Sequence, residues 1–238
     1  GVKIYRGDAL PEDYYGNLFV CEPTGHLVHR EIVVPDGITF TSVPGVDGTA
    51  FFASRDEWCS PVSLEVGPDG ALYVVDMYRA VIEHPEWMPA ELRQRPDLTD
   101  GNDRGRIYRI IPRGFARPES VQLSTTPSAS LVNLLAHRNA WWRETASRLI
   151  LERHEKALAP ALLQVALSHQ SYLARIHALR LLEGLGVLSE ELLLRLLQAS
   201  QPRVVEQAIL ASETRILESE ELHHRIAGLA SHEDPRVR

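Results

Sequence analysis

Three residues with reactive or ligand-binding side chains follow one predicted strand: Asp76, Tyr78 and Arg79. The strand spans residues 71–76, and the three residues leave its end together. A carboxylate suits a hard cation such as calcium, and a guanidinium suits a planar carboxylate. We therefore take the three residues as candidate binding residues. The alternative is structural: Asp76 caps the turn and Arg79 pairs with it.

A second candidate pair, Glu83 and His84, lies in the long polar segment between residues 76 and 105. Segments of this length inside compact domains often carry function. A carboxylate and an imidazole can act as acid and base or bind a metal. Adjacent residues in an extended segment point in opposite directions, however, which favours the alternative of a loop held in place by Trp87 and Pro85. We assign no metal ligand and no catalytic residue.

The other histidines and the cysteines indicate no site. His26 and His29, three residues apart in a predicted strand, face opposite sides, so a shared metal ion is not expected. Cys21 and Cys59 are the only cysteines, and neither belongs to a C-x-x-C-H motif, which excludes covalent haem attachment within this chain. Whether they form a disulfide stays open, because pairing requires Cα atoms about 5.5 Å apart.

Strands and turns must position these residues in the first part of the chain. Alternating apolar residues flank turn signals such as Gly67-Pro68-Asp69-Gly70, which predicts antiparallel hairpins. The predicted strands are 18–22, 26–34, 61–66, 71–76 and 105–112.

Residues 116–130 are rich in proline, serine and threonine and are predicted to form a linker. Residues 131–238 have helical periodicity. Ala146, Ala178 and Ala208 recur at intervals of 32 and 30 residues within similar segments. Two helices per unit at this spacing, with a small residue where helices cross, predict a HEAT-like α-solenoid that the chain's end interrupts.

Composition limits the function further. The chain has 238 residues and a net charge of −7, all of it in residues 1–115, and neither part has the basic surface that nucleic-acid binding requires. No run of residues is long and apolar enough to span a membrane. We expect two domains without nucleic-acid partners.

Several motifs in the first part resemble a known protein family. The segments 5–11, 16–25, 76–79 and 82–87 are similar to membrane-bound dehydrogenases of planctomycete and verrucomicrobial bacteria. Segment 67–76, followed by 105–110, resembles the outgoing half of a blade in six-bladed sugar and sorbosone dehydrogenase-like propellers.

The resemblance implies that residues 1–115 are the last one or two blades of a six-bladed-type β-propeller, followed by the linker and the HEAT-like repeats. It further implies a periplasmic or exported enzyme that uses pyrroloquinoline quinone (PQQ) and calcium to oxidise a sugar or alcohol. Electrons would pass to a cytochrome c module, whose haem lies outside this chain. Asp76, Tyr78, Arg79, Glu83 and His84 become candidate cofactor-binding residues.

The same resemblance leaves the catalytic base unassigned, because it comes from blades that these residues do not include. The chain by itself is therefore expected to be inactive. The alternative function is a non-catalytic scaffold in which the propeller and the solenoid bind protein or polysaccharide, since both architectures serve many functions.

Overall fold

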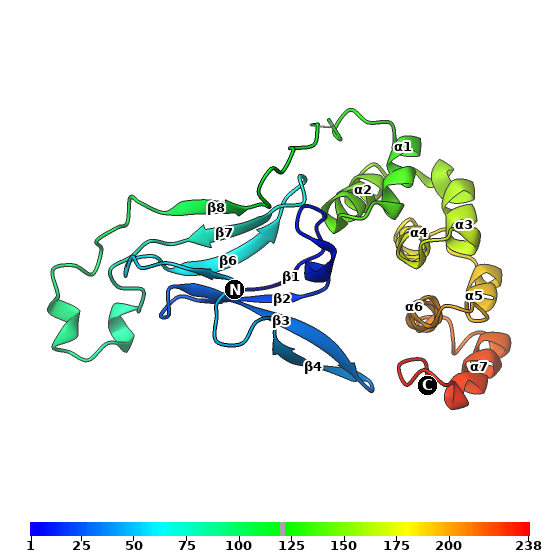
Figure 1. Ribbon diagram of the computed structural model, residues 1–238. Helices are drawn as coiled ribbons and strands as arrows, with labels where there is room; N and C mark the ends of the chain where they lie inside the picture. The colour runs from blue at the N-terminus through cyan, green and yellow to red at the C-terminus, as the bar shows by residue number, and fades with distance from the viewer. Residues whose placement is uncertain (120–121) are drawn as a thin grey trace. The chain divides into compact units, whose positions relative to one another are not determined.

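A computed structural model describes residues 1–119 and 122–238 (Figure 1). The chain divides into two compact units, Gly1–Pro118 and Glu119–Arg238. The first consists of antiparallel β-sheets and the second of α-helices, so the protein is a mixed β and α, two-unit chain. Residues 120–121 belong to the expected linker 116–130 and lie outside the described residues.

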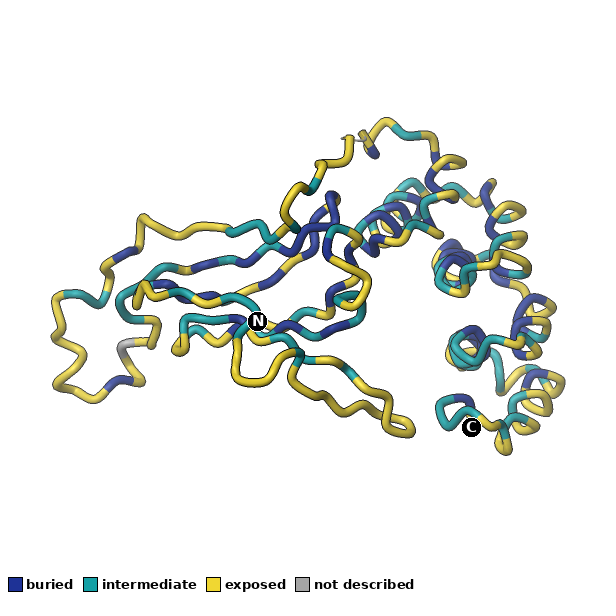
Figure 2. Tube along the Cα trace, viewed as in Figure 1, coloured by how far each residue is buried: buried dark blue, intermediate teal, exposed yellow. Residues whose placement is uncertain are grey.

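The first sheet contains β1 (Val2–Ile4), β2 (Leu18–Glu22), β3 (Leu27–Asp36), β4 (Thr39–Pro44) and β5 (Phe52–Ala53). The strands are antiparallel in the order β1-β2-β3-β4, and β5 pairs with the beginning of β3. The long β3–β4 hairpin is exposed along β4 (Figure 2).

The second sheet contains β6 (Pro61–Val66), β7 (Leu72–Asp76) and β8 (Arg106–Ile110), in that order and antiparallel. Gly70 has a φ of +76° in the turn between β6 and β7, a conformation that glycine adopts without strain. The register places Asp76 opposite Arg106. The predicted hairpin 61–76 and the strand within 105–112 are thus confirmed.

The two sheets pack against each other through β2 and β6. Phe19 and Val28 from the first sheet and Leu64, Leu72 and Val74 from the second belong to one buried cluster. These residues occupy alternate strand positions, so one face of each sheet supplies the core. Because β7 ends in this core, the residues that follow Asp76 leave the sheets at a fixed point.

Tyr5, directly after β1, connects the two sheets. Its ring is fully buried, and its hydroxyl donates to the Gly70 carbonyl oxygen at 2.7 Å. The Tyr5 hydroxyl oxygen in turn accepts hydrogen bonds from the backbone amides of Ala9 and Leu10, at 3.0 and 2.8 Å. The phenol thus fixes the loop 5–10 against the β6–β7 turn.

The helical unit contains seven α-helices within its described residues. They are α1 (Ser128–Asn133), α2 (Ala140–Glu152), α3 (Ala159–Ser168), α4 (Tyr172–Gly184), α5 (Glu190–Leu196), α6 (Pro202–Ser212) and α7 (Glu220–Ala227). Short 3₁₀ helices lie at Leu134–Ala136, Lys156–Leu158 and Gly228–Ser231.

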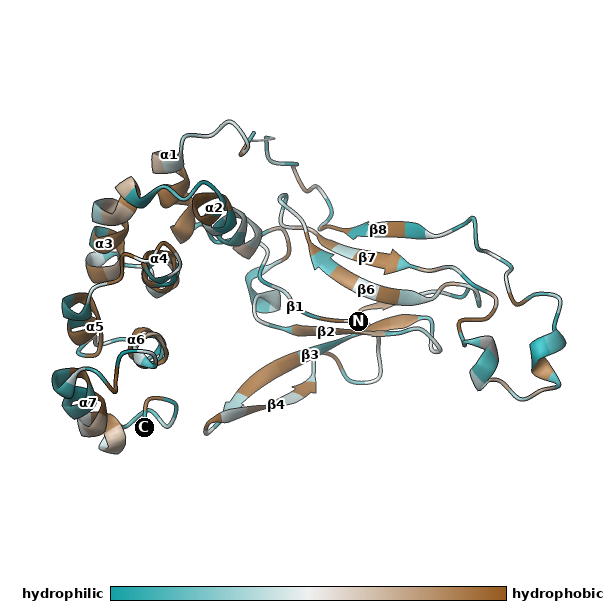
Figure 3. Cartoon of the chain, turned by 180° about the vertical axis from the view of Figure 1, so that it is seen from behind, coloured by the Kyte–Doolittle hydropathy of each residue, from teal (hydrophilic) through white to brown (hydrophobic). Residues whose placement is uncertain are grey.

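These helices form two layers. In one layer α4 contacts α2 and α6, and in the other α5 contacts α3 and α7. Ala146, Ala178 and Ala208 are fully buried, as expected for small residues at helix crossings. Hydrophobic residues face the interior of the stack (Figure 3). None of the described helices is long and apolar enough to cross a membrane.

The expected linker was too long at its C-terminal end. Ser128–Ser130 already belong to α1, because the Pro127 carbonyl accepts the first hydrogen bonds of the helix from Ser130 and Leu131. The side chain of Arg153 further fixes this helix start by donating to the Thr126 carbonyl oxygen at 2.7 Å.

Candidate ligand-binding cleft

A cleft of about 680 Å³ opens beside the end of β7. Three segments that are distant in sequence form it: the turn before β3, the loop before β6 and the insertion between β7 and β8. The ionisable and aromatic residues of its lining are His26, Glu57, Trp58, Arg79, Arg95 and Asp97. Its size falls within the range of about 300–1,000 Å³ that is typical of small-molecule sites.

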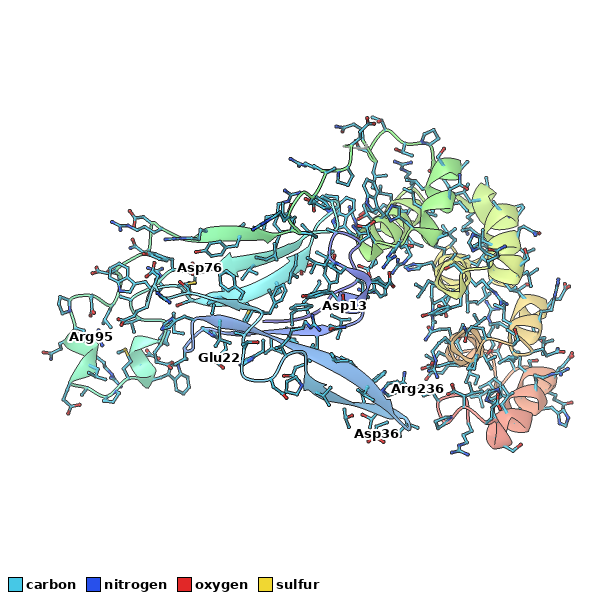
Figure 4. The ribbon with its side chains drawn as sticks, viewed as in Figure 1. Asp13, Glu22, Asp36, Asp76, Arg95 and Arg236 are labelled. Atoms are coloured by element: carbon cyan, nitrogen blue, oxygen red, sulfur yellow. The ribbon has the colours of Figure 1, made fainter. Side chains whose placement is uncertain are left out.

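Asp76 positions two of these segments. It is 1% exposed, and its Oδ1 accepts hydrogen bonds from the backbone amides of Ser60 and Tyr78, both at 2.8 Å. Its Oδ2 has no hydrogen-bond partner among the described residues, and Nε of Arg106 lies 3.8 Å away. Figure 4 shows Asp76 at the end of β7. Asp76 therefore holds the loop before β6 against the insertion.

Backbone pairing continues beyond the strands. The Met77 amide donates to the Ser60 carbonyl and the Arg79 amide to the Trp58 carbonyl, each at 2.9 Å. Arg79 and Trp58 are consequently fixed side by side at the cleft.

Tyr78 contacts Trp58 of the cleft lining. Its φ of +49° is unusual for a residue with a side chain. The ring meets Trp58 edge-on, with 5.9 Å between centroids, and the Arg106 guanidinium lies 3.8 Å from the ring centroid. Such contacts stabilise an aromatic side chain in one orientation. Tyr78 thus orients Trp58.

The two cleft arginines differ in their pairing. Arg95 forms a bidentate ion pair with Asp97, from Nε at 2.8 Å and Nη2 at 2.5 Å. Arg79 donates from Nη1 to the Thr99 carbonyl oxygen at 3.1 Å and, within the described part of the chain, makes no ion pair with a carboxylate. The expected pairing of Arg79 with Asp76 is therefore not observed.

His26 enters the cleft from the turn before β3. Its Nδ1 lies 2.8 Å from the Cys59 carbonyl oxygen. A carbonyl oxygen only accepts hydrogen bonds, so Nδ1 carries the proton and Nε2 is the acceptor of the neutral ring. A φ of +56° contributes to this orientation. His26 thus provides a hydrogen-bond acceptor in the cleft, whereas its spacing in the sequence bears only on metal binding.

Glu83 and His84 are not brought to the cleft. Both are exposed, and among the described residues neither belongs to its lining. The Glu83 carboxylate accepts from the His84 amide at 3.1 Å, and His84 Nδ1 accepts from the Glu86 amide at 3.2 Å. Both side chains stabilise local turns. Trp87, the expected support for this loop, is 79% exposed.

The residues do not fit a calcium site. Calcium takes 6–8 oxygen ligands, whereas no group of three or more histidine, cysteine or acidic residues that suits a metal occurs among the described residues. At Asp76, the Arg106 guanidinium beside Oδ2 would repel a cation. For a quinone carboxylate, the cleft offers the guanidinium of Arg79.

Both cysteines are buried and free. Burial raises the pKa of the Cys59 thiol above its ordinary value, and the negative charge of Asp76 raises it further. Burial likewise raises the pKa of Cys21. Thiols of this kind are weak nucleophiles at neutral pH, so neither contributes reactivity to the cleft.

No curated protein and no solved structure matches the chain significantly. Residues 1–114 match a protein family described as a domain of unknown function (DUF7133). The matched segment covers β1 to β8 and every residue of the cleft lining named above, so the sheet unit is similar to that family.

Proposed function

We propose that this chain belongs to a protein that oxidises sugars or alcohols, and that its own contribution is to bind the substrate in the cleft beside β7. The observation that carries the proposal is the composition of the cleft, in which Trp58 stands among His26, Glu57 and Arg79.

The chemistry of the cleft suits a polyhydroxylated ligand. An indole ring offers an apolar surface for the C–H faces of a sugar, while its neighbours supply directed hydrogen bonds. The cleft provides acceptors at His26 Nε2 and the Glu57 carboxylate and donors at the Arg79 guanidinium. Hydroxyl groups both donate and accept, so they match this mixed set.

Exposed apolar residues on outer strands support a propeller-like assembly. Val2 in β1, Phe40 in β4 and Ile107 in β8 are 62%, 52% and 66% exposed. Large apolar side chains in strands favour burial, so these residues suit the flanks of neighbouring blades. The two-layer packing of helices with buried alanines likewise supports HEAT-like repeats.

The redox part of the proposal rests on the family resemblance. PQQ would oxidise the substrate and a cytochrome c module would accept the electrons, in the periplasm or outside the cell. This chain would then hold the substrate. The resemblance places the catalytic base in blades outside these residues, so we expect the chain alone to bind ligand without turning it over.

Calorimetric titration of the chain with glucose, galactose and sorbitol tests the proposal. We expect saturable binding that Trp58→Ala abolishes. Trp87→Ala is the matched control, because Trp87 belongs to the same unit but is exposed and outside the cleft lining. Equal loss in both variants, or no binding of any of these compounds or of their acidic derivatives, would contradict the proposal.

A further inference from the structure

We propose that the ligand of the cleft carries a carboxylate next to its hydroxyl groups, as uronic and aldonic acids do. Arg79 would bind the carboxylate, and His26 Nε2 would accept a hydrogen bond from a hydroxyl group. The inference rests on the proposed function and narrows its substrate class from sugars in general to acidic sugars.

Arg79 is the first reason. Its backbone is fixed by the hydrogen bond to the Trp58 carbonyl oxygen, and its Nη1 is held by Thr99. The other guanidinium N–H groups form no ion pair with a carboxylate within the described residues. A guanidinium that is positioned but not neutralised favours a planar anion, which it binds with two parallel hydrogen bonds.

Arg95 provides an internal comparison in the same cleft. Asp97 occupies two of its donors, at 2.8 and 2.5 Å, and neutralises its charge. Asp97 and Arg95 therefore neutralise each other's charge in the absence of ligand. The remaining charges of the named lining are those of Arg79 and Glu57. Glu57 is exposed, so water and salt screen its repulsion of an anion.

His26 is the second reason. The hydrogen bond from Nδ1 to the Cys59 carbonyl oxygen leaves Nε2 as an acceptor. A carboxylate cannot donate to Nε2, whereas a hydroxyl group can. His26 and Arg79 line the same cleft. His26 binds a hydroxyl group and Arg79 a carboxylate, so a ligand that carries both groups pairs with both residues.

Calorimetric titration with galacturonate and galactose, at low salt, tests the inference. The two sugars differ at C6, where a carboxylate replaces a hydroxymethyl group. We expect galacturonate to bind about tenfold more tightly than galactose, because one hydrogen bond between charged groups contributes a free energy of that size. Arg79→Gln should remove this preference, so that the variant binds the two sugars with equal affinity. His26→Phe should weaken both sugars to a similar extent, because both offer hydroxyl groups.

Arg104→Gln is the control variant. Arg104 belongs to the same insertion but is exposed and paired with Asp103 rather than lining the cleft. It should keep the preference for galacturonate. Equal affinity for the two sugars would overturn the inference and leave the proposed function standing. A preference that survives Arg79→Gln would also overturn it. No binding of either sugar would overturn the inference, and the proposed function would fall with it only if glucose, sorbitol and their acidic derivatives also fail to bind.

Discussion

Replacing Tyr5 by phenylalanine tests how the two sheets are held together. The substitution keeps the fully buried ring and its edge-on contact with Phe19, and it removes only the hydroxyl group. The hydroxyl group loses its hydrogen bonds with the Gly70 carbonyl and with the Ala9 and Leu10 amides, three among those of the described residues. At about 1 kcal/mol each, the expected loss in free energy of unfolding of the sheet unit is about 3 kcal/mol.

Hydrogen exchange resolved by peptide is the suitable assay, because the chain has two units and need not unfold in a single transition. Amides in β6 and β7 should lose about 3 kcal/mol of protection, and those of α4 none. Tyr14→Phe is the control, since no hydrogen bond from the Tyr14 hydroxyl is seen within the described residues; it should change protection by less than about 0.5 kcal/mol. A loss below about 1 kcal/mol for Tyr5→Phe would refute the reasoning.

Three further substitutions probe the turn and the helices. Burial raises the pKa of Asp69, but hydrogen bonds from Arg109 and neighbouring groups outweigh it and hold the pKa below its ordinary value. The ionised Asp69 carboxylate therefore stabilises the folded state. This stabilisation is present above the unfolded-state pKa and is lost as pH falls through the folded-state pKa. Asp69→Asn should therefore flatten the acid limb of a stability–pH profile measured by urea denaturation, and an unchanged limb would contradict this. Gly70→Ala should cost at least about 2 kcal/mol in the same assay, because φ is positive and Asp8 is in contact, and a neutral effect would contradict the turn geometry. Ser171→Ala removes the cap that accepts from the backbone at the start of α4 and should cost about 1 kcal/mol of exchange protection there, with β7 as the internal control.

The strands of the sheet unit could be predicted wherever a turn signal and alternating residues coincide. The hairpin on either side of Gly70 meets both conditions. Pro35 was expected to end a strand at Val34, but β3 continues to Asp36. Pro35 lies opposite Phe40 of β4, and the pairing of the two strands continues past it although proline has no N–H group to donate. Strand β4 was missed, since its residues are all exposed and show no inward-facing pattern.

The candidate site could be predicted only in part. Asp76 and Arg79 were found because they follow a recognisable strand. The role of Asp76 depends on the Ser60 amide, which the chain brings close only after β6 and β7 pair. His26 and Trp58 were not identified as site residues, because the cleft joins three segments that are distant in sequence and no local motif marks either residue.

Nuclear magnetic resonance of the chain during titration with galacturonate tests the central claim most directly, because it shows where the ligand binds. We predict shifts of the Trp58 indole N–H and of His26 Nε2, with no change at Trp141 and Trp142 in the helical unit. Saturable binding that leaves Trp58 and His26 unchanged would contradict the account.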